Sequence, residues 1–195
     1  MSCVVTFTRE YGSGGRIVAK MLSEQLGIPF YDREIIKYTA EKSGFTEEFV
    51  REAEEKKTAS LLYSLYMTSL PVSDQIFLAQ SQVIQEIARQ GSCVIVGNCA
   101  DYILRDERNC LNVFIYAPLN ERIARVRDEY KDISEDIRTY VLKQDKKRIT
   151  YYNYFTQNKW GHSHNYHLSI NSALGLETCV DITAKAAIAM GVKGE

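Results

Sequence analysis

The chain begins with an apolar strand pattern, a glycine-rich loop and the start of a helix, in that order. Residues 4–8 are apolar or β-branched, which is typical of a buried strand, and apolar residues recur at helical spacing from Ile17 to Leu26. In the loop between them, glycines let backbone N–H groups converge, and the helix dipole adds partial positive charge. The pattern therefore predicts a site for a phosphorylated ligand. The residues expected to hold the phosphate are Gly12, Ser13, Gly14, Gly15 and Arg16.

This loop differs from a Walker A sequence at functionally important positions. A Walker A loop reads G-x-x-x-x-G-K-[ST], with Lys on the β- and γ-phosphates and a hydroxyl on Mg²⁺. When Gly15-Arg16 is aligned with the Gly-Lys of that pattern, Glu10 occupies the position of the first Gly and Ile17 occupies the position of the Ser or Thr. Arg16 still places a positive charge at the lysine position, although its planar guanidinium group differs from the compact ammonium group of lysine. The alternative interpretation is a glycine-rich turn between any buried strand and helix.

Composition narrows the class of protein. The chain has 195 residues and a net charge of −1, which suits one domain over residues 1–195 and gives no basic footprint for nucleic acid. No apolar run approaches the roughly 20 residues that span a membrane, so we expect no membrane association. The five cysteines are odd in number and scattered. Free thiols of this kind fit a reduced, cytoplasmic setting.

The remaining pattern alternates short apolar strands with helices. Strands are expected near 30–31, 93–97, 111–117 and 166–171, and residues 33–91 are almost wholly helical in pattern. Further helices are expected over 98–105, 121–129, 134–153 and 177–190. This alternation predicts a parallel sheet covered on both faces. Ligands bind such sheets beyond the carboxyl ends of the strands, where the glycine loop and three other segments fall.

Polar side chains directly follow two of these strands. Asp32 and Arg33 come after the short second strand, and Asn98 and Asp101 follow the strand that ends at Gly97. They could contact a sugar, base, phosphate or metal-bound water. Alternatively, Asp32 and Asn98 cap the helices that they precede, and Arg33 is solvated.

Later helices supply further arginines. Arg122 and Arg125 are three apart on one helix and share a face, where they could neutralise charge on a transferring phosphoryl group. The alternative is a solvated basic face that also includes Arg127. Asp145, Arg148 and Tyr152 continue an apolar stripe, which suggests a helix face that leaves the core and enters a cleft. Arg148 could instead form a plain surface pair with Asp145.

Histidines and aromatic residues cluster near the end of the chain. His162, His164 and His167 could bind Zn²⁺, but no cysteine or fourth ligand is evident, and a polar loop leading into a strand explains them better. Residues 151–166 are strongly aromatic. Base stacking is one use of such a segment, and packing of a small lid or of a homodimer contact is the commoner one.

Taken together, these segments resemble the cytidylate kinase-like family, within the P-loop nucleoside monophosphate kinases. The resemblance rests on the order and spacing of five pieces that cover nearly the whole chain. They are Thr8–Arg16, Gly27–Glu34, Val94–Leu104, Asn112–Pro118 and the set Asp145, Arg148, Tyr151-Tyr152, Trp160-Gly161 and Tyr166–Asn171.

The family implies a three-layer α/β/α core, with residues 33–91 as a helical acceptor-binding insertion and 145–166 as a lid. The implied reaction transfers the γ-phosphoryl group of ATP, with Mg²⁺, to the small-molecule nucleotide CMP or dCMP. By this resemblance Gly12–Arg16 would hold donor phosphates, and Asp32 and Arg33 would face the acceptor. Arg122, Arg125 and Arg148, together with Arg16, would act on the transferring group. Mg²⁺ would be held through water by Asp32 or Asp101, with no direct protein ligand.

Two further departures leave alternatives open. Related sequences usually have Arg after Gly97, similar to an acceptor-phosphate arginine, and this chain has Asn98. Loss of that bond would cost about 2–3 kcal/mol of phosphate binding unless another cation substitutes. The family also usually has Asp where this chain has His167. A non-catalytic nucleotide-responsive module and a kinase for a different small acceptor are therefore the alternatives.

Overall fold

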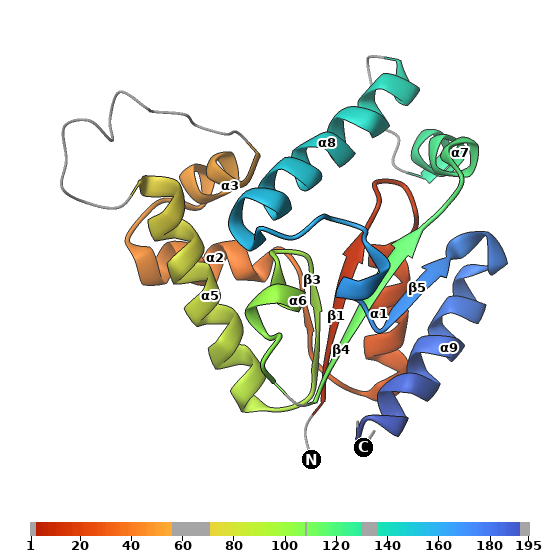
Figure 1. The fold of residues 1–195 in the computed structure, drawn as a ribbon, viewed down its shortest axis with the longest axis horizontal. Helices are drawn as coiled ribbons and strands as arrows, with labels where there is room; N and C mark the ends of the chain where they lie inside the picture. The colour runs from red at the N-terminus through yellow and green to blue at the C-terminus, as the bar shows by residue number, and fades with distance from the viewer. Residues whose placement is uncertain (1–2, 56–70, 108, 130–135, 192–195) are drawn as a thin grey trace.

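The structure, a computed structural model, describes residues 3–55, 71–107, 109–129 and 136–191. Its centre is a parallel sheet in the order β2-β3-β1-β4-β5 (Figure 1). The strands are β1 (Val4–Arg9), β2 (Phe30–Tyr31), β3 (Cys93–Val96), β4 (Cys110–Tyr116) and β5 (Leu168–Asn171). β1 lies in the middle, where Val4 is in register with Cys93 on one side and Cys110 on the other. The expected parallel α/β sheet is therefore confirmed.

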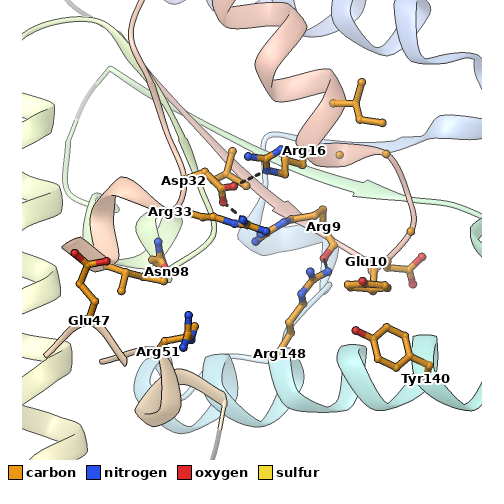
Figure 2. Close-up of a pocket in the computed structure, with 17 residues that line it drawn as sticks. Arg9, Glu10, Arg16, Asp32, Arg33, Glu47, Arg51, Asn98, Tyr140 and Arg148 are labelled. Atoms are coloured by element: carbon orange, nitrogen blue, oxygen red, sulfur yellow. Dashed lines mark hydrogen bonds and ion pairs between the residues drawn. The ribbon is translucent and has the colours of Figure 1, made fainter. Parts of the chain in front are cut away.

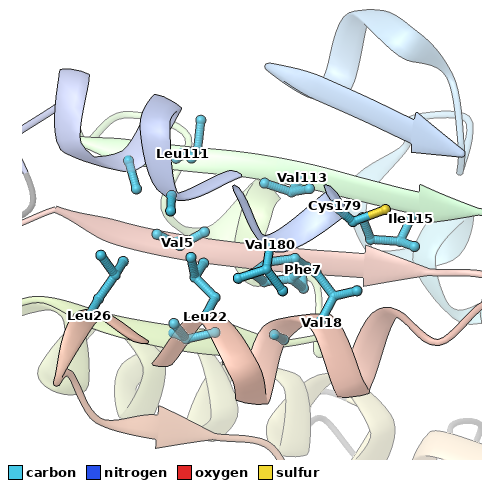
Figure 3. Close-up of a cluster of buried hydrophobic side chains, with 14 of the residues drawn as sticks. Val5, Phe7, Val18, Leu22, Leu26, Leu111, Val113, Ile115, Cys179 and Val180 are labelled. Atoms are coloured by element: carbon cyan, nitrogen blue, oxygen red, sulfur yellow. The ribbon is translucent and has the colours of Figure 1, made fainter. Parts of the chain in front are cut away.

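Alternate residues of each strand pack on opposite faces of the sheet. Val5 and Phe7 of β1 contact α1 (Gly15–Leu26) and α9 (Leu176–Ala189), as Figure 3 shows. Val4 and Ile95 face the other layer, formed by α5 (Val72–Gln90) and α6 (Ala100–Ile103). Because both faces are covered, β3 is apolar throughout, and even the polar residues Thr6 and Thr8 of β1 are buried.

In its described part, the insertion between β2 and β3 consists of helices joined by short connections such as residues 44–46. It contains α2 (Glu34–Ser43), α3 (Glu47–Glu55) and α5, and residues 56–70 lie outside the described part. The hydroxyl of Thr46 accepts a hydrogen bond from the N–H of Phe49 at 3.2 Å and so caps α3. Pro71 directly precedes α5, and Gly91 ends it.

Two helices bring the second half of the chain to the carboxyl edge of the sheet. α7 (Leu119–Glu129) follows β4, and α8 (Ile137–Thr156) runs above that edge (Figure 1). The chain then returns through the short 3-10 helix η1 (Ser163–Asn165) to β5, and η2 (Ser172–Leu174) leads into α9. The ring of Phe114 lies 5.2 Å from Trp160 and 5.0 Å from Tyr166. Trp160 and Tyr166 therefore pack on the sheet, whereas Tyr154 of the same aromatic segment is 49% exposed.

The observed helices shift some expected boundaries. The helix expected over 98–105 is the single turn α6, because Gly97, Asn98 and Cys99 all have positive φ and hold the chain out of a right-handed helix. The helix expected from 134 begins at Ile137, where the Asp136 carboxylate accepts from the N–H of Thr139. Within the described residues, no helix combines the length and apolarity needed to cross a bilayer.

Candidate phosphate-binding site

A pocket of about 860 Å³ opens at the carboxyl end of β1. Its wall combines the glycine loop with residues that follow β2 and β3 and with side chains from α3 and α8. Figure 2 shows Arg51, Glu47 and Asn98 on one side of it and Glu10 and Tyr140 on the other. The wall is positively charged, with five arginines against three acids. The arginines are Arg9, Arg16, Arg33, Arg51 and Arg148, and the acids are Glu10, Asp32 and Glu47.

The glycine loop presents unpaired backbone donors to this pocket. Gly12 and Gly14 adopt left-handed conformations, with φ of 76° and 78°, and α1 begins directly after Gly14. Within the part of the chain that the structure describes, the N–H groups of Gly12, Gly14 and Arg16 have no hydrogen-bond partner. Converging N–H groups at a helix N-terminus bind phosphate. The structure therefore presents backbone donors where the sequence predicts a phosphate site. Ser13, which the sequence also predicts to hold the phosphate, does not line the pocket, because its side chain is buried and its N–H donates to the carbonyl of Glu10 at 3.3 Å.

Close packing explains why glycines build the loop. A Cβ on Gly12 would lie 2.7 Å from the carbonyl oxygen of Arg122, and one on Gly15 would lie 2.6 Å from the Cβ of Arg9. Both distances are well inside van der Waals contact. The loop backbone is therefore pressed against α7 and β1.

The cation of the cradle is paired with the first residue after β2. Nε of Arg16 donates to Oδ2 of Asp32 at 2.5 Å, and Arg9 approaches the other carboxylate oxygen at 3.8 Å. Asp32 is not the cap of α2: the N-cap residue is Arg33, which makes no side-chain capping bond. The interpretation of Asp32 as a pocket residue thus agrees with the geometry, and the capping alternative does not.

Arg122 of α7 forms a largely buried charge network under the loop with Glu10 and Asp145. Arg122 Nε lies 3.3 Å from Glu10 Oε2, and its Nη1 lies 2.5 Å from Asp145 Oδ2. The same Glu10 oxygen accepts from the N–H of Ala117 at 3.1 Å. Burial raises the pKa of Glu10 above its usual value, and the Ala117 bond and the Arg122 charge oppose that effect. Arg122 is therefore not on a solvated basic face.

Among Arg125, Arg127 and Arg148 on α7 and α8, two bind backbone carbonyls at the glycine loop and one is exposed to solvent. Arg125 donates to the carbonyl of Gly12 at 2.8 Å, and Arg148 donates to the carbonyl of Arg9 at 2.9 Å. Arg127 is exposed and pairs with Asp128, as the solvated alternative predicts. Of the arginines expected to act on a transferring group, the structure brings Arg16 and Arg148 into the pocket wall and leaves Arg122 and Arg125 behind the loop.

The far side of the pocket contains residues that the sequence did not single out. Glu47 and Arg51 lie one helical turn apart on α3, and both face the pocket with Arg33 and Asn98 (Figure 2). Asn98 does not cap α6, whose N-cap is Cys99 without a side-chain bond. A pair four residues apart is common on helix surfaces, so its spacing alone gave no functional signal. Only the folded insertion places Arg51 opposite the glycine loop.

Asp101 does not line the pocket. It is 4% exposed and accepts a hydrogen bond from the Tyr152 hydroxyl at 2.7 Å, on the core side of α6. Burial raises its pKa to about 6, and the hydrogen bond from Tyr152 acts in the opposite direction. A role for Asp101 in holding a metal-bound water therefore has no geometric support, which leaves Asp32 for that role.

The three histidines, a candidate Zn²⁺ site in the sequence, have different surroundings in the structure. His167 Nδ1 accepts from the N–H of Asn112 at 2.9 Å, and His162 and His164 are exposed with ring centres 4.9 Å apart. Among the residues that the structure describes, no group of three or more metal-binding side chains comes together. Asp32 is already engaged by Arg16, and Ile17 brings no oxygen to the pocket. The pocket therefore suits a metal ion that enters already bound to a phosphate ligand.

Comparison with solved structures confirms the P-loop kinase fold. A crystal structure of an uncharacterized protein from Eubacterium ventriosum is 26% identical, with a TM-score of 0.73 over 95% of this chain and 98% of that chain. The shikimate kinase of Bacteroides thetaiotaomicron is 15% identical, with a TM-score of 0.55 over 95% of this chain and 98% of its own. A gluconokinase from Sinorhizobium meliloti is 14% identical, with a TM-score of 0.59 over 98% and 94%.

No curated protein sequence matches this chain. The family model of the cytidylate kinase-like family matches residues 4–174, which include the glycine loop, the insertion, α7 and α8. The chain therefore belongs to the cytidylate kinase-like family.

Proposed function

We propose that this protein is an ATP-dependent phosphotransferase that phosphorylates a pyrimidine nucleoside monophosphate, CMP or dCMP. The observation that carries the proposal is the cradle at the start of α1, where the N–H groups of Gly12, Gly14 and Arg16 have no partner among the described residues and the Arg16 side chain adds a positive charge. This arrangement suits the β- and γ-phosphates of a nucleotide. Family membership supports the same reaction type.

On the donor side, the residues position phosphate and neutralise charge. A γ-phosphoryl group on the cradle would have Arg16 beside it and Arg148 above it, since both line the pocket. Phosphoryl transfer needs little covalent chemistry from the protein, so positioning and charge stabilisation account for most of the catalysis. Arg16 and Arg148 are therefore the proposed catalytic cations.

On the acceptor side, Arg33 and Arg51 supply positive charge that the protein itself does not use. Their side chains form no ion pair or hydrogen bond with any residue that the structure describes, and both reach the pocket from the insertion. Such cations bind an anionic acceptor through charge-assisted hydrogen bonds. Arg51 lies on the same side of the pocket as Asn98 and would replace the arginine that relatives carry there.

A nucleoside monophosphate also suits the chemistry of the pocket. Its attacking atom is an anionic phosphate oxygen, which forms the new P–O bond while the bond between the γ-phosphorus and the β–γ bridging oxygen breaks and ADP leaves. No proton has to be removed from this nucleophile. Asp32, paired with Arg16, is thus free to orient groups rather than to act as a general base.

Mg²⁺ would enter as the ATP complex. When bound, the ion supplies charge neutralisation between the β- and γ-phosphates. Asp32 is the carboxylate of the pocket closest to the cradle cation, and it is the residue that we propose to hold a water of that complex.

The test is a nucleotide panel with the purified full chain. ATP and Mg²⁺ are combined with CMP, dCMP, UMP, AMP or GMP, and ADP formation is measured for the wild type and for the Arg16→Met variant. We expect turnover to be fastest with CMP or dCMP and to fall at least a hundredfold in the variant. ATP binding without turnover for any acceptor would favour a non-catalytic nucleotide-responsive module instead.

A second acceptor class is suggested by the same two arginines. Carboxylates as well as phosphates pair with guanidinium groups, and the structural neighbours include a shikimate kinase and a gluconokinase. Shikimate and gluconate therefore belong in the panel. Turnover with a hydroxy acid and none with nucleotides would replace CMP as the acceptor while keeping the phosphotransferase.

A further inference from the structure

The charge network under the glycine loop binds the backbone of Tyr11 from both sides. Asp145 Oδ1 accepts from the N–H of Tyr11 at 2.7 Å, and Arg122 Nη1 donates to its carbonyl at 3.2 Å. Arg122 and Asp145 are joined to each other at 2.5 Å. Together the two side chains satisfy both backbone polar groups of the same residue, just before the first glycine of the cradle.

Neighbouring carbonyls are held in the same way. Arg125 donates to the carbonyl of Gly12 and Arg148 donates to that of Arg9, so side chains from α7 and α8 both fix carbonyls of this segment. Arg125 lies outside the pocket wall, whereas Arg148 is part of it. Because a peptide group is planar, the bond from Arg122 to the Tyr11 carbonyl also directs the N–H of Gly12, which belongs to the same peptide group. The loop donors that remain unpaired, those of Gly12, Gly14 and Arg16, are the ones that form the cradle.

Arg122 cannot leave this network to reach a phosphate without a large penalty. Its side chain is 7% exposed and lies between two carboxylates that are themselves largely buried, those of Glu10 and Asp145. Withdrawing the guanidinium would leave two uncompensated negative charges in a poorly solvated space. Arg122 also lies outside the pocket wall, whereas Arg16 and Arg148 are part of it.

We infer that Arg122 is a positioning residue, which together with Glu10 and Asp145 shapes the phosphate cradle and does not contact the transferring phosphoryl group. The inference rests on the proposed function, since it assumes that the cradle receives a polyphosphate. It also explains Glu10, which stands at the first glycine of a Walker A loop. The Glu10 carboxylate pairs with Arg122 and also accepts a hydrogen bond from the N–H of Ala117, directly after β4.

The experiment separates ground-state binding from the transfer step. Variants Arg122→Met and Arg122→Lys are compared with Arg127→Met, which removes an exposed arginine from the same helix. Binding of ATP and of inorganic tripolyphosphate is measured by calorimetry without acceptor, and single-turnover transfer is measured at saturating ATP. We expect both Arg122 variants to weaken tripolyphosphate binding at least tenfold and to keep transfer at saturating ATP within about threefold, because the lost hydrogen bonds orient the cradle.

Amide exchange gives a second readout that needs no catalysis. In the wild type the Tyr11 N–H should exchange slowly, because Asp145 accepts from it. Exchange in peptides covering residues 10–14 should accelerate in Asp145→Leu and in Arg122→Met, and stay at the wild-type rate in Arg127→Met. If Arg122→Met fails to fold, Arg122→Lys and Asp145→Asn carry the test.

Three outcomes distinguish the possibilities. A hundredfold or greater fall in single-turnover rate with unchanged tripolyphosphate affinity would overturn the inference, since it would place Arg122 on the transferring group. Unchanged exchange and unchanged affinity in all variants would overturn it as well. A wild type that binds tripolyphosphate in an Arg122-dependent way but transfers nothing would support the inference while refuting the proposed function.

Discussion

Arg16 and Asp32 form a pair across the mouth of the phosphate cradle, with Arg16 Nε 2.5 Å from Asp32 Oδ2. The carboxylate is largely covered, with 11% of its side chain exposed, whereas 53% of the Arg16 side chain is exposed. A phosphate on the cradle and Asp32 therefore compete for the same guanidinium. The pair connects the donor loop after β1 to the segment after β2, which leads into the acceptor-side insertion.

Removing this competition should strengthen binding of metal-free ATP. Asp32→Asn frees Arg16 and Arg9 and makes the pocket more positive by one charge. Because partly exposed pairs contribute about 0.2–1 kcal/mol, we expect Kd to fall by up to about fivefold at low salt. Calorimetry at two salt concentrations measures the Kd for ATP, and a substitution of the exposed Asp106, Asp106→Asn, is the control. Weaker binding in Asp32→Asn would mean that the carboxylate orients Arg16 for phosphate.

Arg33 and Arg51 should affect the acceptor and not the donor. Replacing either by Met removes a cation that has no protein partner among the described residues, so the loss appears only when an anionic acceptor binds. A charge-assisted bond contributes about 1.5–3 kcal/mol, and for these exposed side chains we expect the lower end, roughly a tenfold rise in acceptor KM. ATP KM should stay unchanged, as should both constants in Lys37→Met on α2. An equal rise in ATP KM would contradict separate subsites.

The glycine loop can be tested with two left-handed glycines that differ only in their surroundings. A Cβ on Gly12 would lie 2.7 Å from the backbone carbonyl oxygen of Arg122, whereas one on Gly27 would meet nothing within 4 Å. Gly27→Ala should therefore cost about 1 kcal/mol of unfolding free energy from backbone strain alone. Gly12→Ala should cost about 1–3 kcal/mol more and should abolish ATP binding. Urea unfolding measures the stability of each variant, and calorimetry measures its ATP binding. Equal effects in the two variants would contradict the tight packing.

Local patterns in the sequence predicted the sheet, its edge and the phosphate loop. The apolar runs of β1, β3 and β4 predict buried parallel strands, and Gly12 and Gly14 predict the cradle because few other residues accept their backbone angles. What the sequence could not indicate is how α7 and α8 meet the loop. Arg122 reads as part of a surface face, and only the tertiary contacts with Glu10 and Asp145 bury it.

The same limit applies to the acceptor side. Arg51 lies 36 residues after Gly15 in the sequence, and its place in the pocket depends on how the insertion folds back. Asp101 shows the opposite case, since its position after β3 predicted a pocket residue. The three successive left-handed residues Gly97, Asn98 and Cys99 turn it inward to Tyr152 instead. Such a turn has no reliable signature in one sequence.

The buried Asp101 should make stability depend on pH in a direction that is opposite to that of an ordinary paired carboxylate. Its pKa is raised by burial to about 6, so the folded protein holds this proton more tightly than the unfolded chain does. Stability from this group is therefore fully present below about pH 4 and is lost as the pH rises through 6, by an amount on the order of 3 kcal/mol. Asp101→Asn removes the ionisation and keeps an oxygen that accepts from Tyr152. The variant should have a higher Tm than the wild type at pH 7.5, and the difference should shrink towards pH 4, with Asp106→Asn matching the wild type throughout. A Tm difference that stays constant from pH 4 to 7.5 would show that Asp101 is ionised in the folded protein over the whole range.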